Sequence, residues 1–261
     1  MPGRRRSSSP PPPLLEWPGG QLRASMAVAA LRADGQLEVP TGKRIMIEVG
    51  CNNWEMLRDW MASSDDMHLI TFEPLTDKFA YLRHLARGDR WHTVLPYAIA
   101  PPDMEPFVPI RSQNYTDFRG EAGRLFRESG ASSLLPYAEG FRDHWWSESQ
   151  QQYRFFREYF VPTVSLEWVV GSLLGGREVE FLKIDAQGLD YGVFASLGRH
   201  ARKVKRVQME LHQFVRHRGE TPCAEVVDRM RRLHGFRVLR GRCAALDPSV
   251  HDEADVTFGR L

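Results

Sequence analysis

The sequence has few cysteines, no long apolar run and little net charge, and each absence excludes a class of protein. Its three cysteines, Cys51, Cys223 and Cys243, are widely spaced and form no CxxC pair. Neither a disulfide framework nor a zinc site is therefore indicated, and a reducing compartment is expected. No apolar run approaches the roughly 18 residues of a membrane helix. With a net charge of +2, we expect neither a nucleic-acid partner nor a membrane partner.

The first 20 residues, MPGRRRSSSPPPPLLEWPGG, are basic, then rich in serine and then rich in proline. Such a segment cannot bury enough apolar surface to fold, so we predict a disordered tail at 1–20 and a single domain at 21–261. No apolar core follows the arginines, as a signal peptide would require. We expect a cytoplasmic location, with an organelle transit peptide as the alternative reading of this basic, serine-rich segment.

From about residue 43, apolar runs typical of strands alternate with helical periodicity. Strands are predicted at 44–49, 68–72, 91–100, 107–110, 179–184, 204–211, 236–239 and 254–261. Helices are predicted at 53–62, from Thr76 as the capping residue, at 189–197 and at 223–233, with a short strand and helix within 161–174. The pattern predicts an α/β fold with a doubly wound, mostly parallel sheet, closed by an antiparallel C-terminal strand.

An irregular segment at about 111–160 interrupts this alternation. Long insertions in compact domains usually serve function, so we expect this one to cover the substrate. Ser132, Ser133, His144 and Trp145 are its candidate substrate contacts. The alternative is that its aromatic side chains only bury the segment against the sheet.

Three of the predicted strands lead into an acidic residue, namely Glu48, Glu73 and Asp185. Open α/β sheets bind ligands at the carboxyl ends of their strands. Gly50 is the only glycine of a G-x-G-x-x-G pattern after the first strand, which counts against a pyrophosphate ligand. Glu48 favours a cation or an amine, and Glu73 can accept hydrogen bonds from a ribose diol. A positively charged nucleoside without phosphate, S-adenosylmethionine, fits both, although such acids can also simply cap a helix or pair with arginine.

The motifs along the chain resemble those of the FkbM family of S-adenosylmethionine-dependent methyltransferases, over about 43–261. The resemblance is carried by IEVGCN (47–52), TFEP (71–74), AIA (98–100), GASSL (130–134), LKIDAQG (182–188) and QMEL (208–211). It implies a Rossmann-like class I methyltransferase fold. The sequence departs from the family in having Glu48 where Asp is usual and Trp54 in place of a second glycine.

The same resemblance assigns roles to several residues. Glu48, Gly50 and Asn52 match the motif that receives the methionine end of the cofactor, and Glu73 matches the acid that binds the ribose. Tyr97 and Ala98 fall where the third strand passes the adenine. Asp185 matches the acid beside the reacting centre.

Methyl transfer to a hydroxyl requires in-line alignment and benefits from a base within reach of the proton. Asp185, Glu210 and His212 are the candidate catalytic residues, because they end adjacent predicted strands and positions 210 and 212 share a face. All three are metal-ligand types, but no spacing requires a metal, and none is predicted. We therefore expect O-methylation of a small-molecule or sugar-type acceptor. The alternatives are a cofactor-binding relative without turnover and a nicotinamide-dependent oxidoreductase.

Overall fold

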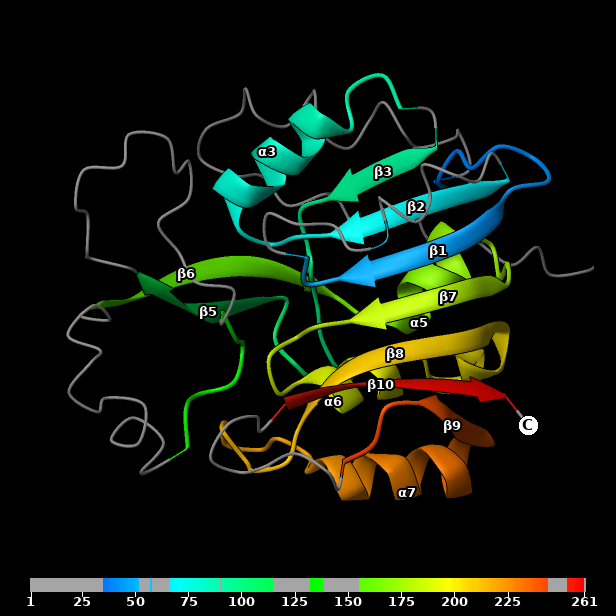
Figure 1. The fold of residues 1–261 in the computed structure, drawn as a ribbon. Helices are drawn as coiled ribbons and strands as arrows, with labels where there is room; N and C mark the ends of the chain where they lie inside the picture. Colours follow the sequence, from blue (N-terminus) through cyan, green and yellow to red (C-terminus); the bar gives the residue numbers. More distant parts are fainter. Residues whose placement is uncertain are drawn as a thin grey trace, which may run out of the picture.

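The computed structural model describes residues 35–51, 57, 66–89, 91–114, 132–138, 155–243 and 253–260. These residues form a seven-stranded sheet in the order β3-β2-β1-β7-β8-β10-β9 and a three-stranded sheet in the order β4-β6-β5 (Figure 1). The strands of the large sheet are β1 (Arg44–Val49), β2 (Met67–Phe72), β3 (His92–Leu95), β7 (Val179–Ile184), β8 (Val204–His212), β9 (Phe236–Arg240) and β10 (Glu253–Arg260).

The middle of the large sheet is parallel, since β1 pairs with β2 and β7, β2 with β3, and β7 with β8. Parallel strands covered on both faces are apolar throughout, and all residues of β2 and five of the six in β1 are buried. Strand β10 runs antiparallel to both β8 and β9. The predicted doubly wound sheet with an antiparallel C-terminal strand is confirmed.

The described helical elements connect these strands. They are α3 (Thr76–Leu85), α5 (Leu166–Trp168) with the π-helical turn η2 (Val169–Leu173), α6 (Asp190–Ala195), the 3-10 helix η3 (Gly198–Lys203) and α7 (Cys223–His234). None of the helices in these ranges is long and apolar enough to cross a membrane. The predicted helix at 53–62 lies outside the described residues except for Leu57.

Two local predictions are wrong in detail. The strand expected at 91–100 is two strands, β3 and β4 (Ala98–Ile99), which belong to different sheets. Pro96 separates them, because a proline has no N–H to continue the hydrogen-bonded ladder. The residue that caps α3 is Leu75 rather than Thr76, and the side chain of Glu73 accepts a hydrogen bond from the backbone N of Leu75 (2.9 Å).

The small sheet lies on the side toward which the arrows of β1 and β7 point (Figure 1). It consists of β4, β5 (Phe107–Asn114) and β6 (Phe155–Val164), and β5 pairs antiparallel with β6. Both β5 and β6 extend into the segment expected to be irregular, so that segment is anchored by a β-ribbon. The small sheet is thus placed next to the carboxyl ends of the parallel strands.

Cys223 and Cys243 form a disulfide, which corrects the expectation that no cysteines pair. The Cα atoms of these residues lie 5.7 Å apart, within the range that a disulfide spans. The fold brings the start of α7 next to the residues that follow β9, a proximity that a separation of 20 residues does not reveal. Such bonds are typical of oxidising compartments, so the cysteine pattern no longer supports a reducing one.

Candidate active site

The carboxyl ends of β1, β2 and β7 meet at one edge of the large sheet. Backbone hydrogen bonds continue past the strands, from Gly50 N to Phe72 O (3.1 Å) and from Asp185 N to Val49 O (2.9 Å). A hydrogen bond from Glu73 N to Leu95 O (3.1 Å) extends the pairing of β2 with β3 in the same way. The backbone at Gly50, Glu73 and Asp185 therefore lies along one edge of the sheet.

Gly50 makes the turn between β1 and the segment that follows it. Its φ of 73° lies in the left-handed region, and a Cβ atom at this position would lie 1.9 Å from the carbonyl oxygen of Asp185. Only glycine permits this backbone angle and this approach to the end of β7. The glycine identified in the sequence thus fixes the spacing between the carboxyl ends of β1 and β7.

Lys183 links two of these acids. Its Nζ lies 3.2 Å from Oδ2 of Asp185 and 3.8 Å from Oε1 of Glu48. Burial alone would lower the pKa of Lys183, but the charges of Asp185 and Glu48 outweigh it and raise the pKa above its ordinary value. The sequence interpretation did not single out Lys183, although period-2 alternation in Lys-Ile-Asp places it on the same face as Asp185.

Glu48 is completely buried, and one of its oxygens accepts a hydrogen bond from the backbone N of Leu57 (3.4 Å). This carboxylate thus connects the end of β1 to Leu57 and to Lys183. Glu73 is also buried, and its contact with Leu75 N fixes the start of α3. Both acids thus have a structural contact as well as a position at the predicted cofactor edge.

The other end of the site lies at β7 and β8. The side-chain nitrogen of Gln187 donates to Asp185 Oδ1 (3.0 Å) and to Glu210 Oε2 (2.5 Å). Burial, together with the negative charges of Asp185 and Glu253, raises the pKa of Glu210 to about 9. Glu210 therefore keeps its proton near neutral pH, and the carboxyl groups at this end of the site favour ligands that form hydrogen bonds.

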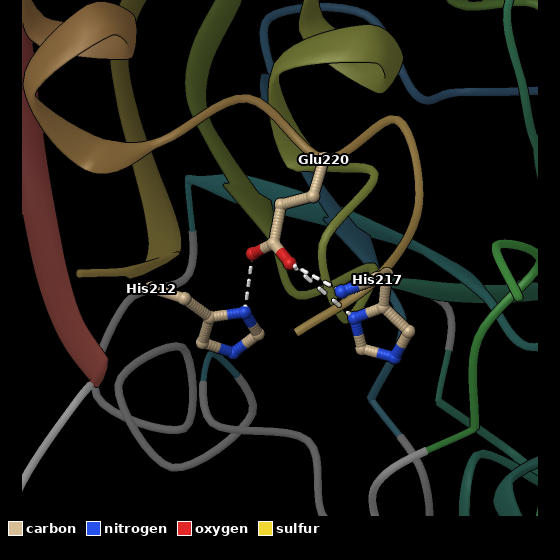
Figure 2. Close-up of side chains that lie close together, drawn as sticks. All are labelled: His212, His217 and Glu220. Atoms are coloured by element: carbon tan, nitrogen blue, oxygen red, sulfur yellow. Dashed lines mark hydrogen bonds and ion pairs between the residues drawn. The ribbon is translucent and has the colours of Figure 1, made fainter. Parts of the chain in front are cut away.

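His212 ends β8 and is fixed by Glu220, as Figure 2 shows. The Nδ1 atom of His212 donates to Oε1 of Glu220, and Nε2 has no hydrogen-bond partner among the described residues. Oε2 of Glu220 accepts from the backbone N of Arg216 (2.8 Å) and of His217 (2.9 Å). Burial alone would raise the pKa of Glu220, but hydrogen bonds from His212 and His217 hold it below its ordinary value.

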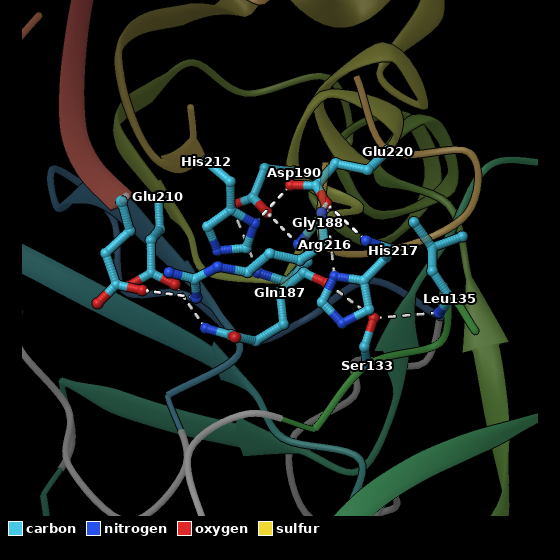
Figure 3. Close-up of polar contacts among 12 residues, drawn as sticks. Ser133, Leu135, Gln187, Gly188, Asp190, Glu210, His212, Arg216, His217 and Glu220 are labelled. Atoms are coloured by element: carbon cyan, nitrogen blue, oxygen red, sulfur yellow. Dashed lines mark hydrogen bonds and ion pairs between the residues drawn. The ribbon is translucent and has the colours of Figure 1, made fainter. Parts of the chain in front are cut away.

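Hydrogen bonds of Ser133 and Asp190 join neighbouring segments to this site (Figure 3). Ser133 Oγ donates to the backbone oxygen of Gln187 (2.7 Å) and accepts from Leu135 N (3.1 Å). Asp190, at the start of α6, accepts from Gly188 N (3.2 Å). Burial and the nearby charge of Asp185 raise the pKa of Asp190 well above its ordinary value.

The remaining predicted site residues are placed as follows. Tyr97 is half-buried against the main core, and Ala98 is buried in β4, just beyond the end of β3. Ser132 directly precedes Ser133 and is half-buried. Asn52, His144 and Trp145 lie outside the described residues. The sequence interpretation missed Lys183, Glu220 and Glu253 as members of this cluster.

The fold and this edge define an α/β methyltransferase of the Rossmann-like class. The family model for the methyltransferase FkbM domain matches residues 45–238. The chain therefore belongs to the FkbM methyltransferase family, and its methyl donor is S-adenosylmethionine. Its residues fit that donor, because the edge carries carboxylates around a glycine turn and lacks the glycine-rich loop of a phosphate site.

Solved structures with a similar arrangement are remote in sequence. A chain of a fibrillarin/Nop5p complex is 11% identical, with a TM-score of 0.43, over 87% of this chain and 76% of that chain. The N-terminal domain of EvdMO1 with SAH bound is 10% identical, with a TM-score of 0.39, over 85% and 75%. A comparison with curated proteins gave no match.

Proposed function

We propose that this methyltransferase transfers the methyl group to a hydroxyl of a small-molecule or sugar-type acceptor. The observation that supports the proposal is the group of polar side chains beyond Asp185. Glu210 and the Nε2 atom of His212 both lie at this end of the site, and both can accept a hydrogen bond from a hydroxyl.

The cofactor supplies an electrophilic methyl group on a positively charged sulfur. In this proposal the turn at Gly50 receives its methionine end, and Glu73 accepts hydrogen bonds from its ribose. Tyr97 and Ala98 flank the adenine. Asp185, held by Lys183 and Gln187, faces the reacting centre, so its carboxylate has a fixed orientation before the ligands arrive.

The acceptor is held in line by groups on the other side of Asp185. Glu210 and His212 orient the acceptor hydroxyl, with Ser132, Ser133, His144 and Trp145 as the expected further contacts. Such positioning is the main requirement for an in-line displacement. Attack by the hydroxyl oxygen on the methyl carbon would break the bond between that carbon and sulfur and leave its electron pair on sulfur, while the hydroxyl proton would pass to the Nε2 atom of His212.

The proposal is tested by calorimetry with SAH and with NAD, followed by transfer of labelled methyl groups to a panel of sugars, polyols and amines. We expect SAH to bind and the label to appear on a hydroxyl. Binding without transfer to any acceptor would indicate a relative without turnover, and binding of NAD alone would indicate an oxidoreductase. Transfer to amines only would remove the hydroxyl assignment.

The role of Asp185 is tested by Asp185→Asn, which keeps the size of the side chain. We expect turnover to fall by about 10²-fold, because a fixed charge is lost next to the reacting centre, while the affinity for SAH changes little. Glu178→Gln is the matched control, since Glu178 is exposed and pairs with Lys205 away from the site. Unchanged turnover in Asp185→Asn would remove Asp185 from this role.

A further inference from the structure

We propose that Glu210, His212 and Glu253 bind a divalent metal ion at the acceptor end of the active site. This replaces the sequence-based expectation of no metal. The proposed role of the ion rests on the methyl-transfer function described above, whereas its binding does not.

The first argument is geometric. One potential ligand atom from each of these three residues lies within 4.8 Å of the others, close enough for one ion to reach all three after small side-chain movements. Glu210 and His212 are two positions apart on β8 and therefore share a face. Glu253 begins β10 and pairs directly with His212 in the antiparallel ladder, so strand register holds the set together.

The second argument is the state of His212. Its side chain is fully buried, and its Nδ1 is bonded to Glu220, so Nε2 is the nitrogen left to bind a ligand. Histidine ligands of metals usually donate their other ring N–H to a carboxylate, which fixes the tautomer. Glu220 performs this function here, and its own oxygens are occupied by His212 and by backbone N–H groups.

The third argument is charge. Glu210 uses Oε2 to accept from Gln187, and Glu253 uses Oε2 to pair with Arg216 (2.9 Å). Among the described contacts, one oxygen of each carboxylate remains for an ion. Asp185 lies nearby, since Gln187 bonds to both Asp185 and Glu210, and an ion bound here would displace the proton that Glu210 otherwise keeps near neutral pH.

A second cluster, formed by His212, His217 and Glu220, is a weaker candidate. Its ligand atoms also lie within 4.8 Å of one another. An ion there would have to displace the hydrogen bond between His212 and Glu220 and the backbone bonds that hold the 216–220 turn. The Glu210 cluster requires no such loss.

One imidazole and two carboxylates suit ions such as Mn²⁺ and Zn²⁺, and they leave coordination positions open. An acceptor hydroxyl bound at such a position would lose its proton to water more readily, because the ion stabilises the negative oxygen. His212 would then act as a ligand rather than as the base expected from the sequence. The acceptor class that fits is one with an oxygen, or two adjacent oxygens, free to bind the ion.

The test is calorimetric titration of the full chain, stripped of metal with EDTA, with MnCl₂ and separately with ZnCl₂. We expect one of the two ions to bind at one equivalent. Glu253→Gln should weaken that binding at least about 10-fold, because one of three ligands loses its charge. Glu178→Gln should bind as the wild type does.

SAH is titrated into the same proteins, and this separates the two proposals. SAH binding by Glu253→Gln shows that the variant is folded, so a loss of metal affinity then reports on the site itself. Binding of neither ion by the wild type, or equal affinity in Glu253→Gln, would overturn the metal site while leaving SAH binding intact. Failure of the wild type to bind SAH would instead contradict the proposed function.

Discussion

Gly50→Ala should destabilise the protein far more than a methyl group normally does. An alanine there would hold a left-handed backbone angle, which costs about 1–2 kcal/mol for a residue with a Cβ. The new Cβ would also lie 1.9 Å from the carbonyl oxygen of Asp185, and this atom belongs to the backbone and cannot rotate away. The ends of β1 and β7 would have to separate, a strain of about 1–3 kcal/mol. We expect a total loss of about 2–5 kcal/mol in the free energy of unfolding.

Gly42→Ala is the matched control. Gly42 has a similar φ of 82°, and a Cβ built there meets nothing within 4 Å. It should therefore lose only the backbone contribution, about 1–2 kcal/mol. Urea unfolding of both variants, followed by circular dichroism, isolates the contribution of the close approach. Equal destabilisation of the two variants would refute the view that Gly50 sets the spacing between β1 and β7.

Two further predictions concern the cofactor edge and the response to pH. Glu73→Gln keeps an acceptor for Leu75 N but loses the charge of the side chain. SAH binding measured by calorimetry should therefore weaken by about 1–3 kcal/mol, with little change in melting temperature. An unchanged dissociation constant would place Glu73 outside the site. Burial, together with His92, lowers the pKa of His68 to about 4, below its ordinary value of 6.5. The unfolded chain therefore binds the extra proton between these values, and the free energy of unfolding should fall by about 2 kcal/mol from pH 7 to pH 5 because of this residue. In urea unfolding, the free energy of unfolding of His68→Gln should fall by about 2 kcal/mol less than that of the wild type between pH 7 and pH 5. An equal fall in both proteins would contradict the lowered pKa of His68.

Local patterns in the sequence were sufficient to predict the parallel strands and the edge they share. Strand β1 and strand β7 have the predicted bounds, because short runs made mostly of apolar residues are typical of strands buried on both faces. The position of an acidic residue relative to the end of a buried strand follows from its sequence number alone. The prediction that Glu48 lies near the end of one strand, and that Glu73 and Asp185 follow the ends of its neighbours, therefore required only the rule that parallel strands share a direction.

Contacts between segments far apart in the sequence could not be predicted from such local patterns. Glu220 reaches His212 across a turn with no periodic signal, and Glu253 reaches it because β10 inserts between β8 and β9. Cys223 and Cys243 can pair because α7 and β9 bring the chain back close to the start of α7. Sequence spacing gives no measure of such distances, which are set by how the chain turns.

Lys183 shows how the two ends of the site depend on each other. It lies between Glu48, near the end of β1, and Asp185, which Gln187 connects to Glu210 at the predicted acceptor end. Each carboxylate in this series is oriented by a partner that a second carboxylate also uses. Removing one member therefore changes the charge balance and the geometry of the next, so the effects of single substitutions along this series should not add. In the proposed mechanism, a network of this kind would hold the predicted cofactor end and the predicted acceptor end of the site as one unit, which an in-line transfer between two bound molecules requires.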